Sequence, residues 1–318
     1  MAAPRHGIGG DSERRLRTLS GRQGIMCRMR GVFRIAALVL VLVVPVLVST
    51  PLGTSAASPQ GSVVVRSVWS RALAHPVRTL VYLPPSYRPG GPRLPTLYLL
   101  HGTPGTPDGL FALGVQDRLD SLIDSGGAPA MIVVAPSGGP RPDSDTEWDD
   151  SVADAGARWG TFVTRDLVKA IDTDYPTKHG RGSRAIAGIS MGGYGAINLA
   201  LGHAGTFGIA SSWSGYFVSN TPDVDGPQGS ATWKARSPLL SVSHLAPALK
   251  RRPIATSFYS GRADRFFDEN VSFNKALTQL GIPHRFRAVA GGHDASVWRA
   301  QMTTELEWIG REFQRANA

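Results

Sequence analysis

Cysteine is nearly missing from this chain, and its charge is moderate and scattered. One Cys among 318 residues excludes a disulfide framework and a zinc site built on cysteines. Charged residues make up 18% of the chain, and the formal net charge is +10. Residues 1–56 contribute +6 of it, through eight Arg against Asp11 and Glu13, and the remaining +4 is spread without a basic run. We therefore expect no nucleic-acid partner.

A long apolar run is lacking as well. The run at 35–48 has fourteen residues, interrupted only by Pro45, whereas a membrane-spanning helix needs about 20. Arginines precede this run at 28, 30 and 34, and the small residues Gly-Thr-Ser-Ala-Ala follow it at 53–57. A basic, then apolar, then small-residue order is typical of a secretory signal peptide.

We interpret residues 1–57 as an export signal that is cut after Ala56 or Ala57. Met26 and Met29 are later start sites that would give a signal of more usual length. The protein is then secreted or held in the cell envelope, and only the signal makes transient contact with the membrane. The alternative is an uncleaved N-terminal segment that anchors the protein in a membrane.

The rest of the chain, 58–318, has a length that fits one catalytic α/β domain better than two small ones. Runs such as 97–100 and 131–134 are apolar at every position, which is typical of parallel strands covered by helices on both faces. The pattern predicts strands at 62–70, 78–83, 96–101, 131–136, 184–190, 207–213, 254–260 and 284–290. It predicts helices at 109–123, 161–175, 191–202, 270–281 and 295–316.

These elements predict an α/β fold with a mostly parallel central sheet and helices on both faces. Only a few residues separate the first two strands, so we expect an antiparallel hairpin at the N-terminal edge. Residues 220–253 form a segment interrupted by Pro and Gly. We expect this segment to be a lid-like insertion that roofs the pocket.

A reactive serine is predicted where a strand pattern meets a helical one. Residues 188–193 read Gly-Ile-Ser-Met-Gly-Gly, which is the G-x-S-x-G pattern in its usual strand–turn–helix context. Gly188 and Gly192 have no side chains, so the strand and the helix can approach closely enough to present the hydroxyl of Ser190 above the sheet edge. A structural serine in a glycine-rich turn is the alternative.

A serine hydroxyl needs a general base before it can attack. Among the eight histidines, His293 is favoured because it follows the last predicted strand, at the sheet edge where sites assemble. The orienting acid is expected between Ser190 and His293 in the sequence. Asp264, which follows the strand at 254–260, is the favoured acid, and Asp268 and Glu269 remain alternatives.

The oxyanion of a tetrahedral intermediate needs two N–H donors. One should be the amide of Met191, directly after the nucleophile, and the other should come from the loop after the third strand. Thr103 is the favoured donor there because Pro104 has no N–H. His101 is expected to brace this loop.

The sequence resembles the esterase D / antigen 85 group of the α/β-hydrolase superfamily, which includes feruloyl esterases and S-formylglutathione hydrolases. The resemblance rests on Val-Tyr-Leu-Pro-Pro-Ser-Tyr at 81–87, Leu-Leu-His-Gly at 99–102, Gly-Ile-Ser-Met-Gly-Gly-Tyr-Gly-Ala at 188–196, Gly-Arg-Ala-Asp at 261–264, and Gly-Gly-His-Asp at 291–294 with Trp298. It implies a triad of Ser190, Asp264 and His293, no metal or other cofactor, and acyl-ester substrates.

These observations predict an exported serine esterase that hydrolyses a small-molecule or glycolipid ester through an acyl-serine. One alternative is an acyltransferase of the mycolyltransferase type, which would move an acyl chain to a sugar hydroxyl. A non-catalytic binding member of the fold is another, disfavoured because serine, acid and histidine occur in the right order.

Aromatic and acidic residues near these motifs are candidates for contact with substrate. We expect such contact from Trp148, Asp149, Tyr194 and Trp298. A solvated acidic loop is the alternative for 148–150. For Trp213, Tyr216 and Phe217, core packing is favoured over a role in an acyl groove.

Overall fold

The computed structural model describes residues 60–316, so the predicted export signal lies outside the described residues. Within them, eight strands form one sheet in the order β1-β2-β4-β3-β5-β6-β7-β8. β1 pairs antiparallel with β2, and β2 with β4, while all other neighbours are parallel. The predicted fold class is therefore confirmed. The strands are β1 Ser62–Ser70, β2 His75–Leu83, β3 Thr96–Leu100, β4 Ile132–Pro136, β5 Arg184–Ile189, β6 Ile209–Trp213, β7 Ala255–Gly261 and β8 Arg285–Val289.

Helices surround this sheet, and two of them, α5 and α10, have the predicted bounds. The helix predicted at 109–123 is instead two helices, because Gly114 adopts φ 92° between them. The one predicted at 161–175 contains a π-helical stretch. The helical elements are α1 Pro107–Ala112, α2 Val115–Asp124, α3 Trp159–Thr161, the π-helical η1 Phe162–Leu167, α4 Val168–Asp174, the 3₁₀ turn η2 Arg181–Ser183, α5 Met191–Gly202, α6 Pro222–Asp225, α7 Ala231–Arg236, α8 Pro238–Arg251, α9 Phe267–Gln279 and α10 Ala295–Ala316.

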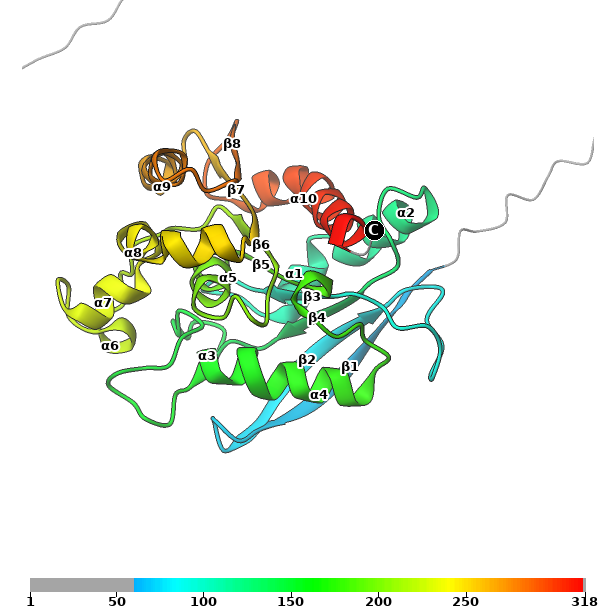
Figure 1. Cartoon of the computed structure of the whole chain (residues 1–318). Coiled ribbons are helices and arrows are strands. Elements are labelled where there is room, and N and C mark those ends of the chain that lie inside the picture. Colours follow the sequence, from blue (N-terminus) through cyan, green and yellow to red (C-terminus); the bar gives the residue numbers. More distant parts are fainter. Residues whose placement is uncertain (1–59, 317–318) are drawn as a thin grey trace, which may run out of the picture. The chain divides into compact units, whose positions relative to one another are not determined.

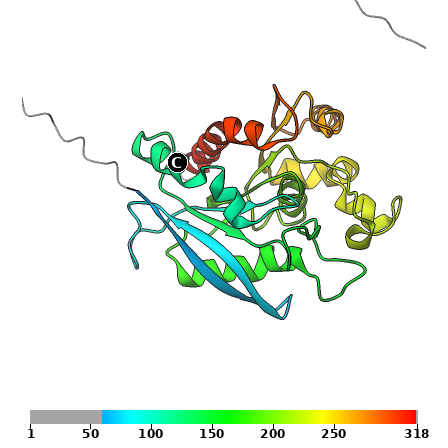
Figure 2. The same cartoon turned by 180° about the vertical axis from the view of Figure 1, so that it is seen from behind.

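The sheet separates two hydrophobic cores, and alternate residues of each strand enter opposite cores. In β3, Tyr98 and Leu100 belong to one cluster, while Leu97 and Leu99 belong to the other. The first cluster includes residues of η1, α4, α5, α8 and α9, and the second includes residues of α1, α2 and α10. Figures 1 and 2 show the same layers, with α10 and α2 on one side of the sheet and α4 on the other. Burial on both faces explains why these strands are apolar at every position.

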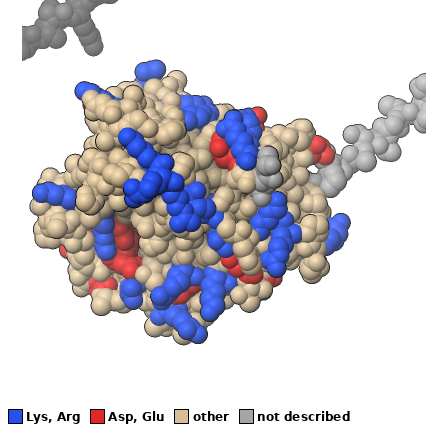
Figure 3. Space-filling model, in the orientation of Figure 1, with Lys and Arg blue, Asp and Glu red and all other residues tan. Residues whose placement is uncertain are grey.

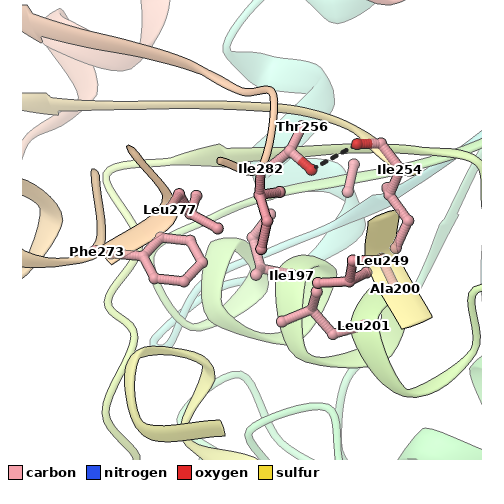
Figure 4. Close-up of a pocket in the computed structure, with 10 residues that line it drawn as sticks. Ile197, Ala200, Leu201, Leu249, Ile254, Thr256, Phe273, Leu277 and Ile282 are labelled. Atoms are coloured by element: carbon pink, nitrogen blue, oxygen red, sulfur yellow. Dashed lines mark hydrogen bonds between the residues drawn. The ribbon is translucent and has the colours of Figure 1, made fainter. Parts of the chain in front are cut away.

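The core between α5, α8 and α9 contains one small gap, shown in Figure 4. Apolar side chains line it, and Thr256 Oγ1 donates a hydrogen bond to the Ile254 carbonyl at 3.0 Å beside it. The volume of the gap is about 10 Å³, at the lower limit for a single water molecule. We therefore regard it as a packing gap and not as a ligand site.

The parallel strands bring four loops to one edge of the sheet. β3, β5, β7 and β8 all run in the same direction, so the loops that follow them leave from the same side. These loops carry the predicted oxyanion, nucleophile, acid and base residues, respectively. Within residues 60–316, no helix combines the length and the apolar character needed to cross a bilayer.

Candidate active site

Ser190 occupies a strained corner between β5 and α5. Its backbone has φ 56° and ψ −118°, a conformation that non-glycine residues rarely adopt. The Ser190 N–H donates to the Trp213 carbonyl at 3.0 Å, which ties the corner to β6. A Cβ at Gly188 would lie 2.3 Å from the Gly192 carbonyl oxygen, so the corner requires glycine at that position. The strand–turn–helix context predicted for the serine is present.

Ser190, His293 and Asp264 form a continuous chain of hydrogen bonds. His293 Nε2 lies 2.9 Å from Ser190 Oγ, and His293 Nδ1 lies 2.9 Å from Asp264 Oδ2. An ionised carboxylate only accepts hydrogen bonds, so Nδ1 carries the proton and Nε2 is free to accept the serine hydroxyl. The other carboxylate oxygen, Asp264 Oδ1, accepts the Phe266 N–H at 2.9 Å. The structure thus brings the three predicted side chains together in the arrangement of a serine hydrolase.

The other acids near Asp264 and His293 in the sequence do not contact the imidazole of His293. Asp268 is exposed in the first turn of α9. Glu269 accepts hydrogen bonds from the N–H groups of Phe217 and Val218. Asp294 accepts the N–H of Ser296 at 2.9 Å and so caps α10. Only Asp264, among the acids weighed from the sequence, contacts the imidazole of His293.

His101 braces the loop after β3, as expected. The Gly138 N–H donates to His101 Nε2 at 2.9 Å, so Nδ1 carries the proton and donates to the Gly102 carbonyl at 2.7 Å. Burial lowers the pKa of His101, which keeps the ring neutral. The Nε1–H of Trp148 donates to the His101 carbonyl at 3.0 Å.

The braced loop lies against the nucleophile. A Cβ at Gly102 would lie 3.0 Å from Ser190 Cβ, so the loop backbone passes next to the serine, and Thr103 follows directly. On the other side, Met191 is the first residue of α5, and the first N–H groups of a helix have no acceptor within it. Both predicted oxyanion donors therefore belong to segments that adjoin Ser190.

A cavity of about 420 Å³ opens above Ser190, within the usual range of small-molecule sites, about 300–1,000 Å³. The loop after β3, α1 and the turn after α1 contribute lining residues, which include the apolar Leu110 and Leu113. His293, Trp298 and Arg265, which follow β8 and β7 or lie on α10, also line it. Of the predicted substrate contacts, Trp298 therefore lines the cavity, and its ring also packs edge-on against that of His293, with centroids 5.4 Å apart.

Three predicted substrate contacts do not line the cavity, and the prediction is wrong for them. Trp148 is fully buried beside the ring of His101. Tyr194 is also fully buried, and its hydroxyl donates to Asp225 at 2.8 Å. Asp149 accepts the amide of Asn198 at 2.8 Å. These three side chains contact other residues of the protein and not the cavity.

Residues 220–253 also behave differently from the expected lid. None of the residues that line the cavity comes from this segment. Its last helix, α8, instead packs on α5 and α9 (Figure 1). The three aromatic residues Trp213, Tyr216 and Phe217 are buried, in agreement with the core interpretation.

The loop before α3 contains acids with raised pKa values, which were not predicted. Glu147 is fully buried and accepts hydrogen bonds from Tyr216 and, at 2.7 Å, from Thr221. Burial raises the pKa of Glu147 to about 8 and that of Asp149 to about 6. Among residues 60–316, no group of three or more His, Cys, Asp or Glu side chains is arranged to hold a metal ion.

Sequence reasoning also missed Arg265. Its side chain lines the cavity, and its Cζ lies 4.8 Å from the centroid of the Phe266 ring. No motif marks this residue, and only its position directly after Asp264 could have pointed to it.

The sheet order and the serine at the strand–helix corner define an α/β hydrolase, and comparison with known proteins identifies the family. The family model described as "Putative esterase" matches residues 70–309. The chain therefore belongs to this esterase family.

Individual relatives agree with that assignment. An esterase of Mycobacterium tuberculosis is 30% identical over an alignment of 248 residues, and the match covers 67% of this chain and 51% of the relative. The MPT51/MPB51 antigen of Mycobacterium bovis is 29% identical over an alignment of 183 residues, and the match covers 52% of this chain and 57% of the antigen. The chain thus spans about half the length of these curated relatives.

Solved structures share the fold. A ferulic acid esterase superposes with a TM-score of 0.70 at 28% identity, covering 80% of this chain and 99% of that one. An S-formylglutathione hydrolase from Agrobacterium tumefaciens gives a TM-score of 0.68 at 19% identity, covering 81% of this chain and 98% of the other. The latter similarity is a similarity of fold alone.

Proposed function

We propose that this protein is an exported serine esterase that hydrolyses carboxylic esters through an acyl-serine at Ser190. The observation that carries the proposal is the chain of hydrogen bonds from Ser190 through His293 to Asp264, which opens onto the cavity of about 420 Å³. Membership of the esterase family supports the reaction class.

The proposed reaction begins when Ser190 Oγ attacks the ester carbonyl carbon and His293 Nε2 takes the hydroxyl proton. Asp264 holds the imidazole in the required tautomer and stabilises the imidazolium. The carbonyl oxygen becomes an oxyanion, which the N–H groups of Met191 and Thr103 stabilise. Each such donor is worth about 10²–10³ in rate.

The tetrahedral intermediate then collapses. The bond from carbon to the alcohol oxygen breaks, and His293 returns its proton to that oxygen, so a neutral alcohol leaves. Water then attacks the acyl-serine with His293 again acting as the base. The products are one carboxylic acid and one alcohol, and the enzyme is restored.

Transfer of the acyl group to a sugar hydroxyl would use the same acyl-serine, so the triad cannot distinguish the two outcomes. The moderate cavity volume favours a compact ester and hydrolysis. Export is proposed from the basic, apolar and small-residue order at 28–57, outside the described residues.

The test is turnover of 4-nitrophenyl acetate by the purified protein and by Ser190→Ala. We expect the substitution to lower kcat by about 10³-fold or more, because the nucleophile is lost. Ser121→Ala is the matched control, since Ser121 is exposed on α2. Equal rates for Ser190→Ala and the parent protein would reject the catalytic assignment. Addition of a sugar, followed by mass spectrometry for acylated sugar, would separate transfer from hydrolysis.

A further inference from the structure

Arg265 carries a permanent positive charge among the residues that line the cavity. The residues that line the cavity include no Asp or Glu, and burial lowers the pKa of His101, another lining residue, and so keeps it neutral. Arg265 is exposed to solvent within the wall that also contains His293 and Trp298. The cavity above the nucleophile therefore has a positive side.

Among the residues that the structure describes, several arginines form ion pairs with carboxylates, whereas Arg265 does not. Arg184 pairs with Asp172, Arg236 with Asp225, and Arg285 with Glu305. Among residues 60–316, no carboxylate forms an ion pair with Arg265. The adjacent Asp264 directs its oxygens to His293 and to the Phe266 N–H. The guanidinium is thus available to a ligand, and its five N–H donors suit a carboxylate or a phosphate.

Aromatic packing fixes the side of the cavity on which this cation lies. Arg265 Cζ lies 4.8 Å from the Phe266 ring centroid, and the Phe266 ring packs edge-on against the His293 ring at 5.3 Å. Arg265 is therefore on the His293 side of the cavity. In the proposed reaction, His293 delivers a proton to the leaving alcohol oxygen, so the alcohol part of the ester lies on this side.

Another part of the cavity lining is apolar. Leu110 and Leu113 come from α1 and the turn after it, and they line the cavity together with residues 102–105. An apolar acyl group fits such a wall, whereas an ionised group there would lose hydration without a partner.

We propose that Arg265 selects esters whose alcohol portion carries a carboxylate or phosphate, with a small apolar acyl group against the apolar lining of Leu110 and Leu113. This inference rests on the proposed esterase function. The guanidinium would pair with the anionic group of the alcohol and hold the ester oxygen near His293 Nε2.

The test compares two acetate esters of nearly the same shape, the anionic 3-acetoxybenzoate and the neutral 3-acetoxybenzamide. We expect the parent protein to favour the anionic ester in kcat/KM, and Arg265→Gln to lower the ratio of the two kcat/KM values about tenfold. The change should lie in KM for the anionic ester. Arg265→Lys should restore part of the ratio, because it keeps the charge and loses the planar fork.

Arg262→Gln is the matched control. Arg262 is exposed on the same loop, stacks on Phe267 instead, and does not line the cavity. Its substitution should leave the ratio unchanged. Raising the salt concentration from about 50 mM to about 500 mM should reduce the anionic preference of the parent protein and of Arg262→Gln, but not of Arg265→Gln.

Three outcomes would overturn the inference. The first is an equal ratio in the parent protein and Arg265→Gln. The second is an equal loss for both esters, which would mean that Arg265 only supports the His293 wall. The third is a preference for mono-4-nitrophenyl succinate over 4-nitrophenyl butyrate with no preference between the two acetate esters. That result would mean that Arg265 binds an anion on the acyl group. Absence of turnover with every ester would instead reject the proposed function itself.

Discussion

Single residues on the loop after β7 have separate tasks although they are close in sequence. Asp264 is buried and contacts His293 Nδ1, whereas Asp268 is exposed at the start of α9. Arg265, between them, faces the cavity. Because α9 begins at Phe267, a shift of only a few residues moves a carboxylate from the imidazole to solvent.

This difference leads to a prediction for the two acids. Asp264→Asn should lower kcat by about 10³–10⁴-fold, because an amide does not stabilise the imidazolium and disturbs the tautomer that leaves Nε2 free. Asp268→Asn, on the same loop and helix, should change kcat by less than about twofold. Steady-state rates with 4-nitrophenyl acetate measure both effects. A larger loss in Asp268→Asn would assign the acid role to that residue.

At the scale of elements, the corner between β5 and α5 depends on close backbone contact. A Cβ at Gly188 would lie 2.3 Å from the Gly192 carbonyl oxygen. A Cβ at Gly192 would lie 2.2 Å from the carbonyl oxygen of Leu100 in β3. The corner therefore holds β3, β5 and the start of α5 together while it keeps Ser190 at positive φ. Backbone strain at the nucleophile is maintained by the packing around it.

Gly188→Ala should therefore destabilise the protein. The new Cβ would lie 2.3 Å from backbone that cannot move independently, so we expect the free energy of unfolding to fall by at least about 2–3 kcal/mol. Gly202→Ala, at the end of α5 with no atom within 4 Å of its Cβ position, should be neutral or stabilising by up to about 1 kcal/mol. Urea unfolding measures both, and similar values would contradict this account of the corner.

At the scale of the whole molecule, the buried acids connect the loop before α3 to the segment that contains α6 and α7. Glu147 accepts hydrogen bonds from Tyr216 and Thr221, and Arg236 pairs with Asp149 and Asp225. Figure 3 shows that Lys and Arg on the visible face form several separate groups, some beside acidic residues. The buried acids, unlike such surface charges, are protected from solvent and therefore influence global stability more strongly.

Glu147 should make stability depend on pH. Its pKa is raised by burial from 4.5 to about 8, so between these values the folded state binds more protons than the unfolded state. Glu147 therefore contributes a decrease in the free energy of unfolding as pH rises from about 5 to about 8. Asp149, with a raised pKa of about 6, adds a decrease in the lower part of this range.

Glu147→Gln should remove most of the decrease between pH 6 and pH 8, since the amide does not titrate. Glu307→Gln is the control, because Glu307 is 42% exposed and pairs with Arg311 on the surface of α10. Urea unfolding at several pH values gives the slopes. An unchanged slope in Glu147→Gln would show that another group titrates in this range.

Local patterns were sufficient for much of this structure. Continuous apolar runs predicted the buried strands, and glycines at 188 and 192 predicted the sharp corner at Ser190. The helix boundaries around Gly114 and the π-helical stretch at 162–167 were missed, because both depend on how the helices meet the core. Trp148 and Tyr194 were misjudged because an aromatic residue near a motif can face the core as readily as the cavity.

The amino-acid sequence by itself determined the layered sheet and the order of serine, acid and histidine along the chain, since periodicity and glycine placement are local properties. Which acid meets the imidazole, which aromatic residue reaches the cavity, and where Arg265 points were decided by tertiary structure alone. Ser190 and His293 are 103 residues apart and Asp264 and His293 are 29 apart, and their contacts exist because parallel strands end at one edge. Distances between such segments depend on the packing of the whole sheet and its helices, which no local pattern contains.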